Sequence, residues 1–106
     1  MKFGEAIEQA RNGKRIAREG WNGKDMYVYM TPGRVIPVEE WKASGPAHAL
    51  TETERNRGCV IIAPRMDMMS AQGVRIIGWL ASQTDMLAED WYVVEQEDNR
   101  APGESE

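Results

Sequence analysis

Short runs of apolar, β-branched and aromatic residues recur along this chain, separated by polar and turn-forming residues. Runs of this length are typical of strands in an antiparallel sheet, where an extended backbone needs few residues to cross the core. We therefore predict five strands, at residues 15–18, 26–30, 60–68, 74–79 and 91–94. Most of them are expected to pair as hairpins with a neighbour in the sequence.

Two helices complete the predicted fold. Apolar residues within segment 3–12 recur at helical spacing, and Gly13 ends the pattern. Ser82 is suited to cap a short second helix, with Asp85 as a favourable acid in its first turn. The predicted class is α+β: a small antiparallel sheet of about five strands with an N-terminal helix and a short C-terminal helix.

The connections are less regular. Residues 70–73, Ser-Ala-Gln-Gly, are predicted to close a hairpin. Residues 31–34, Thr-Pro-Gly-Arg, place Pro and Gly at the central positions of a type II turn. Residues 35–43 fit neither a helix nor a strand pattern, and residues 44–58 have no period, so we predict a loop there.

The size and composition of the chain bound its class. With 106 residues, 42% hydrophobic and 28% charged, it is expected to form one globular domain over residues 1–95. Residues 96–106 are acidic and lack large apolar side chains, so we predict a disordered tail. No apolar run approaches the ~20 residues that span a bilayer. The single cysteine, Cys59, lies in an apolar run and is interpreted as core packing in a reducing cytosol.

The net charge of −4 comes from the C-terminal end of the chain. Residues 95–106 carry five acids and one arginine, which leaves residues 1–94 with no net charge. Binding to long nucleic acid requires a broad basic face, so the balance argues against it. A small phosphorylated ligand needs only one or two cations and is not excluded.

Metal and catalytic chemistry find little support. The only histidine, His48, has no cysteine or carboxylate at metal-ligand spacing, which argues against a zinc site or a histidine-based triad. The adjacent acids Glu89 and Asp90 are more typical of a solvated helix face than of general acid–base catalysis. We expect a protein that is not an enzyme and needs no metal or cofactor.

Two loops and a strand offer side chains that bind polar, flat ligands. In the first loop, Trp21 and Asn22 are framed by glycines beside Arg18 and Lys24; the alternative is that Trp21 seals the edge of the core. Tyr27 and Tyr29 share one face of a predicted strand. In the third group, Ser82 to Asp85 follow Trp79; the alternative is that Ser82 and Asp85 form a capping box. The residues of these three groups that we predict to bind a ligand are Arg18, Trp21, Asn22, Gly23, Lys24, Tyr27, Trp79, Ser82, Gln83, Thr84 and Asp85.

Three segments resemble a small family of phage and prophage proteins, the second Thoeris anti-defence family. They are Met-Lys-Phe-Gly-Glu-Ala at 1–6, Gly-Lys-Arg-Ile-Ala-Arg-Glu-Gly-Trp-Asn-Gly-Lys at 13–24, and Trp-Leu-Ala-Ser-Gln-Thr-Asp-Met-Leu-Ala-Glu-Asp-Trp at 79–91. The resemblance covers roughly residues 1–31 and 60–94 in matching order.

The resemblance implies a function. Thoeris is a bacterial defence whose sensor enzyme makes a cyclic ADP-ribose isomer from NAD, and that signal activates a suicidal effector. Family members are sponges that bind the signal, glyco-cyclic ADP-ribose, in pockets of a homotetramer without degrading it. Some also hold cyclic dinucleotides at a separate site. The chain is therefore expected to act in the cytoplasm of an infected bacterium.

In that interpretation Trp21 stacks on the base, Asn22 and Asp85 bind the ribose or base edge, and Lys24 or Arg18 lies near phosphate. The residues from Ser82 to Thr84 line the same pocket, either in the same chain or from a neighbouring subunit. Two other classes stay open. A nucleotide hydrolase would use Asp85 and the adjacent acids at 89 and 90, and an interaction protein would cap a protein partner.

The sequence also departs from the family pattern. Asp25 stands where a glycine or small residue is expected, and Gly78 stands where proline is common before the Trp. Residues 32–58 match no part of the family pattern.

Overall fold

The computed structural model describes residues 1–95, which fall into two compact units. The sheet unit comprises residues 1–30 and 66–95, and the ribbon unit comprises residues 31–65. The single-domain assignment for residues 1–95 stays a prediction, and the acidic tail at 96–106 lies outside the described residues. Among the described residues, no helix is long and apolar enough to cross a membrane.

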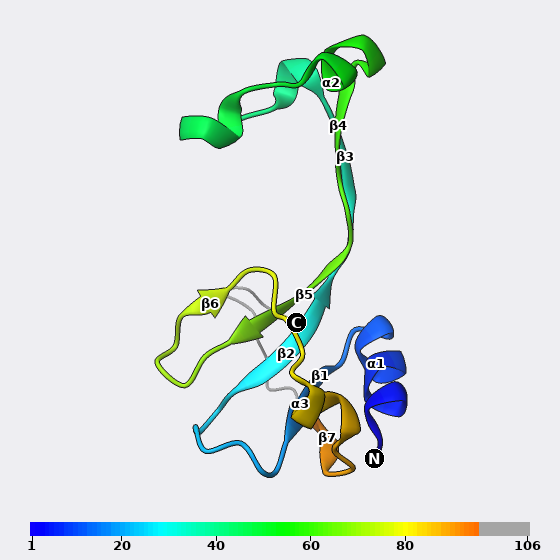
Figure 1. Cartoon of the computed structure of the whole chain (residues 1–106), viewed down its shortest axis with the longest axis vertical. Helices are drawn as coiled ribbons and strands as arrows, with labels where there is room; N and C mark the ends of the chain where they lie inside the picture. The colour runs from blue at the N-terminus through cyan, green and yellow to red at the C-terminus, as the bar shows by residue number, and fades with distance from the viewer. Residues whose placement is uncertain (96–106) are drawn as a thin grey trace, which may run out of the picture. The chain divides into compact units, whose positions relative to one another are not determined.

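The predicted α+β class is confirmed. A five-stranded antiparallel sheet has the strand order β6-β5-β2-β1-β7 (Figure 1). Its strands are β1 (Arg15–Arg18), β2 (Tyr27–Thr31), β5 (Arg65–Met69), β6 (Arg75–Ile76) and β7 (Trp91–Val94). The two helices of the sheet unit are α1 (Phe3–Arg11) and α3 (Gln83–Leu87).

Helix α1 packs on one face of the sheet, along β1 and β7 (Figure 1). Its buried residues, Ala6 and Ala10, have small side chains that let the helix approach the strands closely. Ile16 of β1 pairs in register with Val28 of β2, and both side chains are fully buried in this core. Trp91 of β7 is only 2% exposed and completes the cluster.

The predicted hairpin at residues 70–73 is confirmed, but the second of its strands is shorter than predicted. The turn is closed by the Gly73 N–H, which donates to the Ser70 carbonyl. Strand β6 ends at Ile76 because Gly78 takes a positive φ of 84° and donates its N–H to the Asp67 carboxylate at 2.8 Å. The strand predicted over residues 74–79 is therefore wrong except at Arg75–Ile76.

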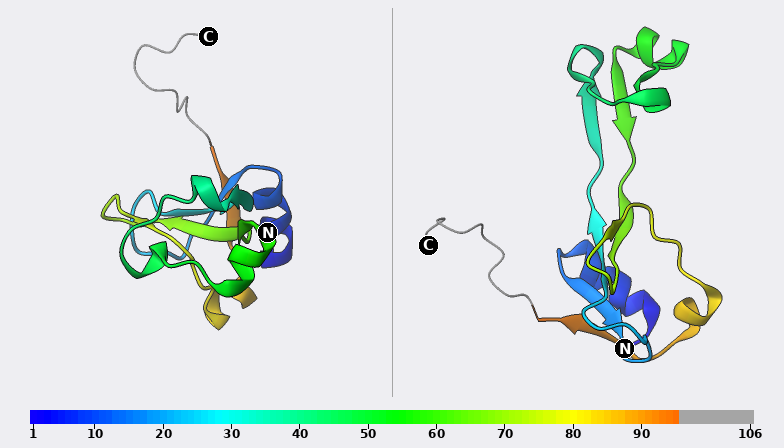
Figure 2. Two further views of the ribbon diagram at one scale, coloured as in Figure 1. Left: turned by 90° about the horizontal axis from the view of Figure 1, so that it is seen from above. Right: turned by 90° about the vertical axis from the view of Figure 1, so that its left-hand side faces the viewer.

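The ribbon unit is built on β3 (Arg34–Pro37) and β4 (Cys59–Ile62), which run antiparallel (Figure 2). The single strand predicted over residues 60–68 is wrong, because it is interrupted at Ala63 and Pro64. Proline has no N–H to donate to a ladder, so β4 and β5 end and begin on either side of it.

The segment between β3 and β4 contains short helices. They are the 3₁₀ helices η1 (Val38–Glu40) and η2 (Gly45–His48), and α2 (Glu52–Arg57). The loop predicted over residues 44–58 is therefore wrong. Helix α2 begins with a capping box, in which Thr51 and Glu54 each accept a bond from the other's backbone N–H, and ends at Gly58 in the left-handed conformation.

The type II turn predicted at residues 31–34 is also wrong. Gly33 does not have the positive φ that such a turn requires, and β3 begins at the next residue, Arg34. Gly33 instead lets the backbone of the opposite ribbon strand approach closely. A Cβ at Gly33 would lie 2.6 Å from the Ile62 carbonyl oxygen, so a side chain there would push the ribbon strands apart.

Candidate functional site

A cluster of charged and polar groups joins the end of β1 to α3 and the start of β7. Arg18 donates from Nη1 to Asp85 Oδ1 at 2.8 Å and from Nε to Asp90 Oδ1 at 2.8 Å. The other Asp90 oxygen accepts the backbone N–H of Gly20 at 2.8 Å. The Arg18 and Asp85 side chains are each 14% exposed and the Asp90 side chain is 31% exposed, so the Arg18–Asp85 pair is the better shielded from water. The cluster therefore fixes the start of the loop that carries Trp21.

Trp21 is oriented by this cluster. Its indole N–H donates to Asp85 Oδ1 at 3.1 Å, the same oxygen that accepts from Arg18. Its ring meets Trp91 edge-to-face, with centroids 5.4 Å apart, and Trp79 at 6.4 Å. The ring is partly buried against the core, as in the core-sealing alternative, and it keeps an accessible part. These contacts fix the orientation of the Trp21 ring.

Helix α3 presents Asp85 to the cluster. The Ser82 hydroxyl caps the helix by accepting the Asp85 N–H at 3.0 Å, as predicted. The Asp85 carbonyl accepts the indole N–H of Trp91 at 2.9 Å. The backbone of Asp85 is therefore fixed by nearby residues, and its carboxylate by Arg18 and Trp21 from a distant part of the chain.

The electrostatics keep both acids ionised. Burial acts to raise the pKa of Asp85, but hydrogen bonds from Arg18, Trp21 and Ser82 outweigh it, so the pKa lies below its ordinary value. The hydrogen bond from Arg18 is the main cause of the lowered pKa of Asp90. The same pairs raise the pKa of Arg18, Asp90 first and Asp85 second. At neutral pH the two carboxylates are hydrogen-bond acceptors.

The structure brings five of the predicted site residues together. They are Arg18, Trp21, Trp79, Ser82 and Asp85. Gln83 and Thr84 are exposed on the first turn of α3, next to this group. Asn22 and Lys24 are exposed on the loop that follows Trp21.

Two predicted site residues have other surroundings. Gly23 is a packing position, because a Cβ there would lie 2.6 Å from the Ala71 Cβ. Tyr27 follows the alternation of β2, in which Val28 points to the core, so Tyr27 lies on the opposite face of the sheet from the Trp21 cluster.

The sequence did not indicate the roles of Asp90 and Trp91 in holding the cluster together. Asp90 was interpreted as a solvated acid, yet it holds Arg18 and the Gly20 N–H. The pairing joins residues 72 positions apart, so no local spacing signals it. The described residues contain no group of three or more His, Cys, Asp or Glu side chains that could hold a metal ion.

Comparison with known proteins gives a consistent result. The family model of the Thoeris anti-defense 2-like domain matches residues 1–94. The match includes residues 32–58, so the expectation that this segment lies outside the family pattern is wrong. The chain belongs to the Thoeris anti-defence 2 family. It is 34% identical over 94 residues to a protein of Bacillus phage SP01 named Thoeris anti-defense 2, a match that covers 89% of this chain and 94% of the relative.

The two departures from the family pattern fall at unusual backbone positions. Asp25 has a positive φ of 61°, a conformation in which glycine costs least. Gly78, where the resemblance led us to expect proline, has φ 84°, which a proline ring cannot adopt.

Proposed function

We propose that this chain is a phage-encoded anti-Thoeris protein that binds and sequesters glyco-cyclic ADP-ribose without degrading it. Its action belongs in the cytoplasm of the infected bacterium, where the signal is made. The observation that carries the proposal is the indole of Trp21, held by Asp85 in a chain of the Thoeris anti-defence 2 family. A sponge must bind tightly, near nanomolar or about −12 kcal/mol, and preorganised aromatic contacts reduce the entropy lost on binding.

The contacts within the cluster refine the proposed roles. Arg18 already pairs with two carboxylates, so its charge is balanced before any ligand arrives. Lys24 is exposed on the same loop as Trp21 and is the better candidate for a phosphate contact. In this proposal Trp21 stacks on the base, and Asn22, Gln83 and Thr84 donate to or accept from polar edges. Arg18 and Asp85 position Trp21.

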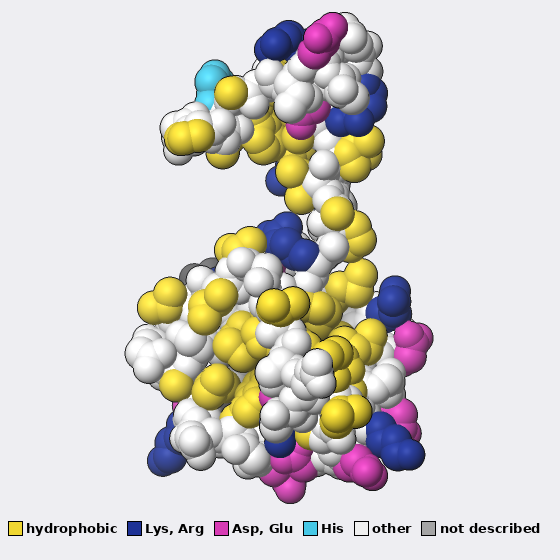
Figure 3. Space-filling view, viewed as in Figure 1, with side chains coloured by type: hydrophobic (Ala, Val, Ile, Leu, Met, Phe, Trp, Pro, Cys, Tyr) yellow, Lys and Arg dark blue, Asp and Glu magenta, His cyan; other side chains and the backbone are white. Residues whose placement is uncertain are grey.

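We further propose that the chain forms a homotetramer, as the family resemblance implies, and exposed apolar surface supports this. On the ribbon unit, Val35 and Ile61 lie directly opposite each other and are 68% and 53% exposed. A two-stranded ribbon is marginal by itself in water, so this unit gains most from a partner. On the sheet unit, apolar side chains gather near β6 and α3 (Figure 3). The most exposed of them are Ile77, Leu80 and Leu87. Burial of such patches between copies is the usual means of stable assembly.

The test is to incubate the purified chain with glyco-cyclic ADP-ribose, remove the protein by filtration, heat the retained fraction, and run chromatography on both fractions. The proposal expects the signal to leave the filtrate and to return intact after heating. Conversion to a new product would show a hydrolase, and an untouched signal would exclude this ligand. In that case cyclic dinucleotides and then protein partners are the next candidates.

A further inference from the structure

The face of the sheet opposite α1, here called the outer face, carries a row of aromatic and basic side chains. Residues alternate along each strand, so the buried Ile16 and Val28 leave their neighbours Arg15, Tyr27 and Tyr29 on this face. Arg75, which pairs in register with Met69, adds a second arginine from β6. The proposed signal site lies on the other side of the sheet and uses none of these groups; Tyr27, expected from the sequence to belong to it, lies on the outer face.

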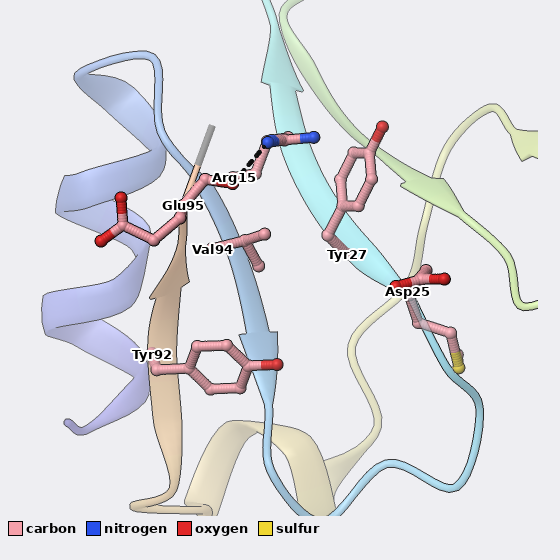
Figure 4. A pocket seen from close by; sticks show the side chains of 7 residues that line it. Arg15, Asp25, Tyr27, Tyr92, Val94 and Glu95 are labelled. Atoms are coloured by element: carbon pink, nitrogen blue, oxygen red, sulfur yellow. Dashed lines mark hydrogen bonds between the residues drawn. The ribbon is translucent and has the colours of Figure 1, made fainter. Parts of the chain in front are cut away.

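Two cavities open on the outer face, and they share Arg15 and Tyr27. The larger has a volume of about 380 Å³ (Figure 4). Its lining comprises Arg15, Asp25, Met26, Tyr27, Tyr92, Val94 and Glu95. The smaller has a volume of about 250 Å³. Its lining comprises Gly13, Lys14, Arg15, Tyr27, Tyr29, Met30 and Arg75.

The two cavities differ in charge. The smaller has three cations, Lys14, Arg15 and Arg75, and no acid in its lining. The larger has Asp25 and Glu95 beside the shared arginine. Clustered cations suit a phosphate, whereas carboxylates accept hydrogen bonds from sugar hydroxyls and amino groups. A ligand that spans both cavities therefore needs a phosphate at one end and donors at the other.

Aromatic rings line both cavities: Tyr29 the smaller, Tyr92 the larger, and Tyr27 both. The Arg15 guanidinium lies 4.8 Å from the centroid of the Tyr27 ring, and the Arg75 guanidinium donates to the Tyr29 hydroxyl at 3.0 Å. Tyr92 projects from β7 across β1 toward the cavity (Figure 4) and is 41% exposed. Exposed tyrosine rings provide a flat surface for a base or sugar.

Arg15 is only partly satisfied. It donates from Nη2 to the Glu95 carbonyl at 2.8 Å, but its buried Nε has no hydrogen-bond partner among the described residues. A buried donor without an acceptor is unfavourable, so a small shift of the guanidinium onto an anion would be favoured. Arg15 thus has a physical reason to bind a phosphate.

We propose that the outer face is a second binding site, for a small phosphate ester of the size of a single nucleotide. Its phosphate would lie among Lys14, Arg15 and Arg75, and its hydroxyl or amino groups would reach Asp25 and Glu95. Cavities of this size fall within or just below the ~300–1,000 Å³ range of small-molecule sites, and only the smaller has clustered cations, so a ligand with one phosphate fits better than a cyclic ligand with two. The site is independent of the proposed sponge function.

The experiment is isothermal titration of the intact chain with adenosine 5′-monophosphate, ribose 5-phosphate, adenosine and inorganic phosphate. Binding is expected for both phosphate esters, weaker binding for inorganic phosphate, and the weakest for adenosine. Arg15→Gln is expected to weaken the binding of adenosine 5′-monophosphate about tenfold or more, since it removes a charge-assisted hydrogen bond. Arg11→Gln is the matched control, because it removes the same charge from α1, on the opposite face.

Circular dichroism and the melting temperature check that each variant is folded. Should Arg15→Gln fail to fold, the exposed Arg75→Gln or Lys14→Gln takes its place, with the same expected direction. The proposal is overturned if adenosine 5′-monophosphate does not bind, or if these variants bind it as tightly as the unmodified chain. It is also overturned if Trp21→Ala abolishes this binding while Arg15→Gln does not, because the nucleotide would then occupy the Trp21 site.

Discussion

The two faces of the five-stranded sheet use arginine in different ways. On the face that carries α1, Arg18 is paired with two carboxylates and is 14% exposed. On the outer face, Arg15 and Arg75 lie against tyrosines instead of carboxylates. A paired arginine holds other side chains in place, whereas an unpaired one keeps its charge for a ligand. The position of an arginine in this chain therefore does not by itself indicate an anion site. Whether the arginine is already paired with a carboxylate decides whether its charge can bind a ligand.

The largest loss of stability is expected on the face of the sheet that packs against α1, where Trp91 is buried. Trp91→Ala is expected to lower the free energy of unfolding by about 3–5 kcal/mol, because a large side chain that is 2% exposed leaves a cavity. Tyr92→Ala is the matched control on the next residue, which faces outward, and should cost less than about 1 kcal/mol. Urea unfolding measures both. Equal losses for the two variants would contradict the assignment of the faces.

The next effect concerns ligand binding at Trp21. Trp21→Ala is expected to weaken the binding of glyco-cyclic ADP-ribose by about tenfold to hundredfold or more, the size of a lost base–aromatic stack. It should leave a folded oligomer, which size-exclusion chromatography would show. Trp21→Phe keeps an aromatic face and should retain most of the affinity. Unchanged affinity in the alanine variant would end the stacking proposal.

The paired cluster also predicts an acid sensitivity. Because Arg18 lowers the pKa of Asp90, and Arg18 and Trp21 outweigh burial to lower that of Asp85, the unfolded state binds these protons more readily. The stability from the cluster is therefore complete above the ordinary aspartate pKa of ~3.9 and is lost as the pH falls through the lower folded values. Melting temperatures from pH 6 to pH 2 measure this loss.

Two substitutions show whether the cluster causes the acid sensitivity. Asp90→Asn should lower the melting temperature at pH 7 and reduce its further fall in acid, since one titrating group is removed. Glu8→Gln is the control, because Glu8 and Arg11 form an ion pair whose side chains are 68% and 61% exposed. It should keep the full acid dependence. The cluster is not the cause if Asp90→Asn and the unmodified chain lose stability in parallel.

Local signals explain what the sequence predicted correctly. Three predictions rest on residues close together in the sequence, and all three are confirmed. They are helix α1 from its apolar spacing, strand β2 from its alternation, and the cap of α3 from the Ser82 hydroxyl. The capping box of Thr51 and Glu54 was equally local and was overlooked, since residues 44–58 were judged by their lack of period. The pattern was present in the sequence.

Other features depend on contacts that no local pattern encodes. Arg18 and Asp90 meet across 72 positions, so the sequence showed a free cation and a solvated acid where the fold makes an ion pair. Gly33 was predicted in a turn because Pro-Gly favours one. In the structure its lack of a side chain allows the Ile62 carbonyl to pack closely against it. Tyr27 was included in the same ligand site as Trp21, although strand alternation places it on the opposite face of the sheet. The alternation gives the face of a strand residue, but the face on which α1 packs depends on the tertiary fold.

The smallest expected effect concerns Asp25, which lines the larger cavity of the outer face with φ at 61°. A residue with a Cβ costs roughly 1–2 kcal/mol in the left-handed conformation, less for Asp, and glycine avoids this cost. Asp25→Gly should therefore equal or exceed the unmodified chain in free energy of unfolding, and Asp25→Ala should fall below the glycine variant by about 1 kcal/mol. Denaturant unfolding of the pair measures the difference. Equal stabilities would mean that the loop relaxes when Asp25 is replaced; a more stable glycine variant would mean that this chain carries an acid at the outer face at a cost in stability.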